Sequence, residues 1–203
     1  MSEPITLAEA KAYLRETSSD HDDLITALIT DAREEIEADT WRALVPLTKT
    51  VQLRGFPVAE PGAFGLVNPA PLQIVLPRPP LISIESLTYI DAAGVERSYD
   101  VETLRIDIRH EPGTIEPPYG STWPETRDDP AAVVIEFVCG YPTTDDVPQM
   151  LKAAVRLILS QLYEHAEPTE LARAGGGTGQ TRTTLDRILE KFRIRDKRLL
   201  AFL

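Results

Sequence analysis

The densest group of potential metal ligands in the chain is the run Asp20-His21-Asp22-Asp23. Carboxylate and imidazole groups bind metals well, but a site needs three or four of them directed at one point. Consecutive residues on a helix point in different directions, and no second group of spaced ligands completes a site. Acidic residues here instead favour the start of a helix, where they interact with its dipole. We therefore expect a helix N-terminus and no metal site.

Nucleophilic catalysis would need a serine or cysteine beside a histidine and an acid. The three histidines are His21, His110 and His165, and the single Cys139 excludes an internal disulfide. No Gly-x-Ser-x-Gly turn is present, and Cys139 ends an apolar strand pattern, which is typical of a small buried side chain. We expect solvated or capping histidines, no cofactor and no enzymatic activity.

A glycine run and two tryptophans are the other candidates for a binding site. Gly175 to Gly179 lacks the Lys-Ser/Thr pair of a phosphate-binding loop and follows no strand pattern, so we interpret 172–180 as a flexible linker. Trp41 ends a helical pattern and Trp123 lies in a proline-rich loop. We expect both to cover packed regions, although Trp123 is also placed to anchor a neighbouring molecule.

Charge is distributed unevenly along the chain. The formal net charge of −11 argues against a protein that wraps nucleic acid by neutralising phosphates. Residues 181–203, however, hold seven basic and three acidic residues. A basic tail on an acidic body predicts docking on a partner or a sister subunit. DNA binding by the tail is the alternative, although Phe192 and Phe202 alone do not make a stacking series.

Membrane and export signals are not apparent in the sequence. No apolar run is long enough to span a bilayer, and Met1-Ser2-Glu3-Pro4 has neither the basic nor the apolar part of a signal peptide. We expect a protein that is made in the cytoplasm and has no membrane partner.

Helical patterns lie at both ends of the chain. Two amphipathic helices are predicted over residues 6–15 and 22–41, the first opening with the capping box Thr6-Leu7-Ala8-Glu9. A third, strongly apolar helix follows Asp146, and a fourth, with bases on one side, opens at Thr183.

The middle of the chain has strand patterns. The strongest is a hairpin, in which residues 81–90 and 95–99 flank the turn Asp91-Ala92-Ala93-Gly94. On another strand, 103–108, the apolar residues share one face. The Pro/Gly-rich segments 55–71 and 112–130 are expected to be loops. The remaining predicted strands are 48–53, 73–76 and 133–138.

These elements predict an α+β fold, with a helical bundle built from both ends of the chain and an inserted antiparallel β-rich module. The bundle is expected to comprise 1–44 and 146–171, and the module 45–145. Residues 172–203 would form the linker, a basic amphipathic helix and an apolar tail.

A series of segments in this order carries a resemblance: ITLAEAKAYLR (5–15), DLITALITDAREEIEADTWRAL (23–44), LPRPPLISIESLTYIDAAG (76–94), PGTIEPPYGSTWPETRDDPAAVVIEFVCGYP (112–142) and VPQMLKAAVRLILSQLYEH (147–165). The series resembles the head–tail connector (adaptor) proteins of tailed bacteriophages, in the branch with a β domain inserted into the helical bundle. No single motif is specific; the order of the segments carries the resemblance.

The resemblance implies a structural virion protein of the particle neck that is assembled in the host cytoplasm and catalyses nothing. Such proteins form a ring of identical subunits under the portal protein, with symmetry matched to the portal dodecamer. The ring extends the channel through which genomic DNA passes transiently, and it presents a platform for the tail or stopper protein.

In the wider family the C-terminal segment reaches the portal, and an apolar end that is buried on assembly is consistent with this role. The alternative is a DNA-contacting packaging or regulatory factor that uses the same basic tail. The residues expected at the portal or subunit interface are Arg187, Lys191, Arg193, Arg195, Lys197, Arg198, Leu199 and Phe202.

Overall fold

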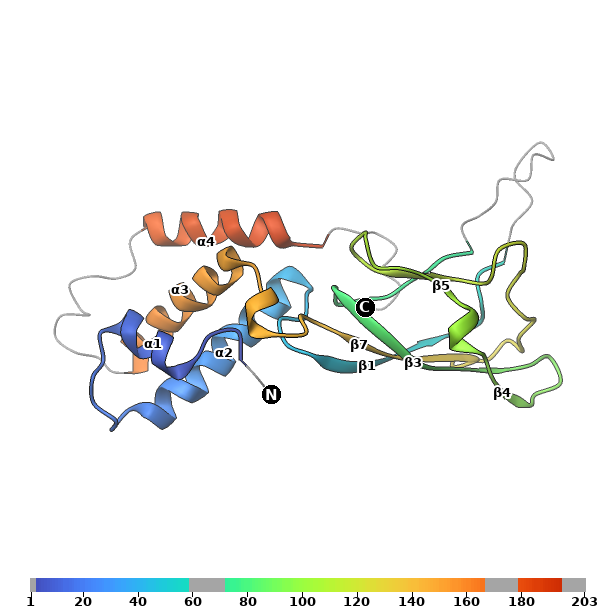
Figure 1. The fold of residues 1–203 in the computed structure, drawn as a ribbon, viewed down its shortest axis with the longest axis horizontal. Coiled ribbons are helices and arrows are strands. Elements are labelled where there is room, and N and C mark those ends of the chain that lie inside the picture. The colour runs from blue at the N-terminus through green and yellow to red at the C-terminus, as the bar shows by residue number, and fades with distance from the viewer. Residues whose placement is uncertain (1–2, 59–71, 167–178, 195–203) are drawn as a thin grey trace. The chain divides into compact units, whose positions relative to one another are not determined.

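The computed structural model describes residues 3–58, 72–166 and 179–194. Within these ranges it contains helices from both ends of the chain and two antiparallel sheets (Figure 1), which confirms the predicted α+β class. The described chain divides into two compact units. The helical unit comprises residues up to Pro46 and from Tyr141 onward, and the β unit comprises Leu47–Gly140.

The N-terminal helices form as the sequence predicts. Helix α1 (Leu7–Leu14) opens with the capping box, in which the Glu9 amide donates to the Thr6 hydroxyl and the Thr6 amide donates to the Glu9 carboxylate. Helix α2 (Asp22–Thr40) begins with acidic residues and ends at Trp41, which adopts a left-handed conformation with φ of 60°.

The C-terminal helices differ from the prediction in one respect. After the short 3-10 helix η3 (Thr144–Asp146), helix α3 spans Gln149–Ala166, following Pro148 as expected. Helix α4 spans Gly179–Phe192 and therefore begins four residues before the predicted Thr183. The predicted start was wrong because extending a helix that packing already holds by another turn costs little, whatever cap signal lies inside it.

The helical unit has one apolar core, to which all four of the described α-helices contribute. Fully buried side chains come from both ends of the chain, with Ile25 and Ile36 on α2 and Leu151 and Ile158 on α3. Burial of their apolar area is the main favourable term for this unit. The shorter helices add Ala10, Leu185, Ile188 and Leu189.

The larger sheet of the β unit has the strand order β1-β7-β3-β4, with all neighbours antiparallel. Its central strand β7 (Val133–Cys139) alternates between buried and less buried residues, and Phe137 is fully buried. Cys139 is buried too, as predicted. The other strands are β1 (Leu47–Leu53), β3 (Leu81–Ile90) and β4 (Glu96–Ser98).

The smaller sheet has the order β2-β6-β5. Strand β6 (Thr114–Glu116) lies in a segment that we expected to be a loop; its three residues are too few to show alternation beside so many prolines. It pairs with β2 (Ile74–Val75) and with β5 (Arg105–Asp107), which follows the 3-10 helix η2 (Val101–Thr103).

The expected apolar face of 103–108 is mostly exposed. Leu104 is buried, but Ile106 is 43% and Ile108 60% exposed. Strand β5 lies at the edge of its sheet, pairs with β6 alone among the described strands, and has a ladder of only three residues. An edge position leaves one side of a strand uncovered, so the alternation marked a strand without marking burial.

An aromatic cluster packs within the β unit. The Trp123 ring stacks on Phe56 with centroids 4.6 Å apart and planes 1° apart, and its indole N–H donates to the Leu72 carbonyl at 2.6 Å. Tyr89 and Tyr99 flank the stack. Trp123 is 7% exposed, which confirms that it covers a packed region.

We expect Phe137→Ala to lower the free energy of unfolding of the β unit by about 3–5 kcal/mol, because it leaves a cavity under the central strand. Urea denaturation followed by far-ultraviolet circular dichroism measures the change. Thr50→Ala on β1, where the side chain is exposed, is the control and should change stability by less than about 0.5 kcal/mol. Equal losses in the two variants would contradict the assigned core.

Candidate assembly surface

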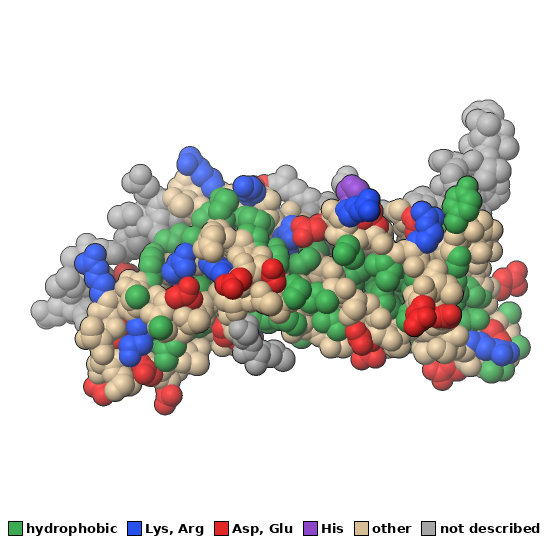
Figure 2. Space-filling model, viewed as in Figure 1, with side chains coloured by type: hydrophobic (Ala, Val, Ile, Leu, Met, Phe, Trp, Pro, Cys, Tyr) green, Lys and Arg blue, Asp and Glu red, His purple; other side chains and the backbone are tan. Residues whose placement is uncertain are grey.

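Helix α4 presents two charged rows on its exposed side: a basic row, Arg187 and Lys191, which we call the basic stripe, and beside it an acidic row, Asp186 and Glu190. Leu185, Ile188 and Leu189 are buried against the bundle, whereas Arg187 and Lys191 are exposed. These two bases are four residues apart, so they lie one above the other on the same face. Basic side chains gather over α4 in Figure 2, beside apolar surface.

The end of this stripe lies on apolar groups. The Lys191 Nζ lies 5.8 Å from the centroid of the Phe192 ring and 3.5 Å from Sδ of Met150 on α3. Met150 is 40% exposed. Exposed methionine and aromatic side chains are enriched at protein interfaces, and here the lysine ammonium lies against both.

Arg193 forms a hydrogen bond within the helical unit. Its Nε donates to the Asp39 carbonyl at 3.0 Å, and the Ile194 amide donates to the Thr40 carbonyl at 3.0 Å. In return, Nε of Arg42 donates to the Phe192 carbonyl at 2.7 Å. The last turns of α2 and α4 thus satisfy one another's free carbonyls. We call these contacts the C-terminal clamp.

The predicted interface residues are therefore not equivalent. Arg187 and Lys191 lie on an open helix face, and Arg193 belongs to the C-terminal clamp. The clamp was not visible in the sequence, because it joins residues about 150 positions apart. The other predicted residues, Arg195, Lys197, Arg198, Leu199 and Phe202, lie outside the described residues.

The exposed side of α2 is acidic. Asp31 and Glu35 are exposed and, like the bases on α4, are four residues apart. No ion pair joins Asp31, Glu35 or Arg187 to another residue within the described ranges. The other exposed carboxylates on this helix are Asp23, Glu34 and Asp39.

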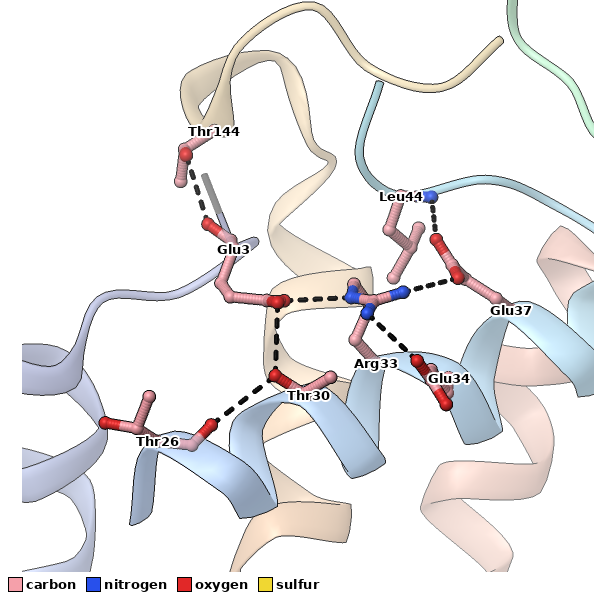
Figure 3. A network of polar contacts seen from close by, with 8 residues as sticks. All are labelled: Glu3, Thr26, Thr30, Arg33, Glu34, Glu37, Leu44 and Thr144. Atoms are coloured by element: carbon pink, nitrogen blue, oxygen red, sulfur yellow. Dashed lines mark hydrogen bonds and ion pairs between the residues drawn. The ribbon is translucent and has the colours of Figure 1, made fainter. Parts of the chain in front are cut away.

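On the same helix, Arg33 holds a network of carboxylates (Figure 3). Its Nε donates to Glu3 at 2.9 Å and its Nη1 to Glu37 at 2.7 Å. Glu37 also accepts from the Leu44 amide at 2.6 Å, and the Thr30 hydroxyl donates to Glu3 at 3.2 Å. The network fastens the start of the chain and the segment after α2 to one helix.

Two pKa shifts follow from these contacts. Burial lowers the pKa of Arg33, but the nearby carboxylates of Glu37 and Glu3 outweigh it, so the pKa is raised overall. The hydrogen bond from the Thr6 amide lowers the pKa of Glu9 despite some burial, helped by the Thr6 hydroxyl.

The acid–histidine run begins α2, as predicted. His21 precedes the helix, with its Nδ1 3.0 Å from the Tyr163 hydroxyl, which itself donates to Glu16 at 3.2 Å. The Ser18 amide lowers the pKa of Glu16, with help from Tyr163. In the part of the chain that the structure describes, no three His, Cys, Asp or Glu side chains gather in a way that would hold a metal ion.

The other histidines lie elsewhere. His110 is exposed, and its Nδ1 lies 3.0 Å from an Asp107 carboxylate oxygen. This contact lowers the pKa of Asp107. His165 falls in the last turn of α3. Within the described ranges, no helix is long and apolar enough to cross a bilayer.

We expect Arg33→Met to lower the free energy of unfolding by about 1–3 kcal/mol, because Glu3 and Glu37 would keep their partial burial and lose their counter-charge. Thermal unfolding by calorimetry measures the effect. Glu34→Gln is the control: this carboxylate is 65% exposed, and its loss should cost less than about 0.5 kcal/mol. A larger effect of Glu34→Gln would show that the network is not centred on Arg33.

The capping box predicts a pH dependence. The folded-state pKa of Glu9 lies below its ordinary value of 4.5, so the ionised carboxylate stabilises the fold above that pH. This contribution disappears as pH falls through the folded-state pKa. The stability difference between the wild type and Glu9→Gln should therefore be present at pH 7 and shrink below pH 4.5, as measured by thermal unfolding across a pH series. A difference that is constant with pH would exclude the charge as its origin.

Known proteins resemble this chain in part of its sequence and in its fold. Residues 4–69 match the family model of the phage gp6-like head-tail connector protein, a range that includes α1, α2 and β1. No curated protein matches the chain.

Solved structures match nearly the whole chain. A chain from the neck of an empty gene transfer agent (GTA) particle, with C6 symmetry, has a TM-score of 0.71 and 22% identity; the alignment covers 95% of this chain and 91% of that one. A chain from the virion of a native GTA particle has a TM-score of 0.67 at the same identity and coverage. A chain from the native GTA neck with C12 symmetry has a TM-score of 0.65 and 21% identity, covering 94% of this chain and 89% of that one.

At this identity the likeness establishes a shared fold. The family match over residues 4–69, added to that fold, confirms the resemblance to phage head–tail connector proteins that the order of the sequence segments predicted.

Proposed function

We propose that this protein is a structural connector in the neck of a phage-like particle. The observation that carries the proposal is the fold shared with GTA neck chains over 95% of this chain. The connector family match at the N-terminus supports it independently. The role is non-catalytic: the described residues provide charged and apolar surfaces for contacts with other proteins.

Identical subunits would assemble as a ring. The neck structures that share the fold carry C6 or C12 symmetry, and a ring of twelve copies would fit a dodecameric portal. Repeated weak contacts around such a ring add up to a stable assembly. The ring would extend the DNA channel and serve as the platform for the tail or stopper protein.

The C-terminal residues would dock on the portal. The C-terminal clamp fixes the chain as far as Ile194, so the residues beyond it start from a defined point. Basic residues there would give charge complementarity, and the apolar end would supply buried area. The acidic body would let DNA pass without adhering, because like charges repel.

Deleting Asp196–Leu203 should leave the body folded and abolish binding to the portal, since the clamp and the helical core lie before the deletion. Native mass spectrometry of the protein mixed with the portal protein of the same particle measures binding. The wild type should add twelve copies to one portal ring. Undiminished binding by the truncated protein would contradict the assignment of the tail.

The DNA-contacting alternative makes a different prediction. A factor that neutralises phosphates loses duplex affinity steeply as salt rises, whereas a connector needs no measurable affinity for free duplex. Fluorescence anisotropy with a labelled duplex at about 50 and 200 mM salt separates the two cases. Steep, salt-dependent binding together with no portal binding would favour the alternative.

A further inference from the structure

A closed ring of identical subunits places a specific demand on each subunit. Successive copies are related head to tail, so each must carry two different surfaces that fit one another. If the protein is the proposed connector, two different surfaces of its helical unit can therefore meet between neighbouring copies.

The first surface is the exposed face of α4. Arg187 and Lys191 form its basic stripe, and Met150 and the Phe192 ring lie beside Lys191. Asp186 and Glu190 form the adjacent row, in which Glu190 pairs with Arg193 at 3.6 Å. Cations around a partly exposed apolar group resemble the anchor and rim of a protein interface.

The second surface is the outer face of α2. Asp31 and Glu35 carry its central charges, and the other exposed carboxylates continue them along the helix. The opposite face of α2 is buried in the core through Ile25, Ile29 and Ile36. The acidic face is therefore directed away from the bundle that holds the helix in place.

We propose that the basic stripe of α4 on one subunit docks against the acidic face of α2 on the next copy of this chain. Charge complementarity between the two rows supports a second copy as the occupant, and the Glu190–Arg193 ion pair offsets part of the acidic row beside the stripe. Each stripe has its charges four residues apart, about 6 Å along its helix, so the two pairs can meet in one register. The Arg33 network keeps α2 in place within the unit, and the C-terminal clamp does the same for the end of α4.

The experiment uses four full-length variants. The first reverses the basic stripe (Arg187→Glu with Lys191→Glu), and the second reverses the acidic one (Asp31→Lys with Glu35→Lys). The third combines all four changes. The matched control, Lys49→Glu with Arg54→Glu, makes the same change in net charge as the first variant on exposed residues of the β unit. Circular dichroism establishes that each variant is folded.

Self-association is measured by native mass spectrometry and sedimentation at about 50 mM salt, where surface charges are weakly screened. The first and second variants should each associate at least about tenfold more weakly than the wild type, because each places like charges opposite one another. The third variant should recover association, since its charges are exchanged and remain complementary. The control should behave as the wild type does.

Mixing the first two variants provides the sharpest test. One carries acidic stripes on both helices and the other basic stripes on both, so neither pairs with itself and each pairs with the other. The mixture should form rings with the two proteins alternating in a 1:1 ratio. A variant that had merely lost its fold would not be rescued in this way.

Three results would overturn the inference. They are rings in the first two variants as stable as those of the wild type, a mixture that stays unassociated, and a wild-type protein that remains monomeric at every concentration tested. None of these contradicts the proposed function, which depends on recruitment to the portal. Absence of portal binding by the wild type would instead contradict the function while leaving the α2–α4 contact measurable.

Discussion

The structure depends on the packing of two helices that lie on opposite sides of the β unit in the sequence. Helix α2 precedes the β unit and α3 follows it, yet their apolar residues share one core. The chain must therefore leave the bundle and return to the same place. The β unit meets this constraint because its first and last strands pair directly, with Leu47 opposite Cys139. Hydrogen bonds within this sheet therefore hold the two ends of the inserted segment side by side.

Features with short-range causes were predictable from the sequence. The capping box of α1, the acidic start of α2 and the hairpin turn at Asp91 each depend on a few neighbouring residues. What escaped prediction depends on distant residues. Strand β6 exists because β2 and β5 flank it, and the exposure of Ile106 reflects the edge position of β5 in its sheet.

The same distinction between short-range and long-range causes applies to the candidate assembly surface. A basic amphipathic helix is visible in the sequence, since helical spacing separates Leu185 and Ile188 from Arg187 and Lys191. The sequence does not show which of the basic residues forms a hydrogen bond within the helical unit. Arg193 is engaged because it donates to the Asp39 carbonyl, which lies about 150 residues earlier in the sequence. The composition showed an acidic body, and the helix geometry concentrates part of that charge on one face of α2.

The C-terminal clamp also determines how the helical unit would carry a mechanical load. A pull on the chain beyond Ile194 reaches the amide that is bonded to Thr40, and with it the guanidinium bonded to Asp39. The Arg42 side chain adds a third link, because it donates to the Phe192 carbonyl. These three hydrogen bonds would all have to break before residues 192–194 could separate from the end of the longest described helix.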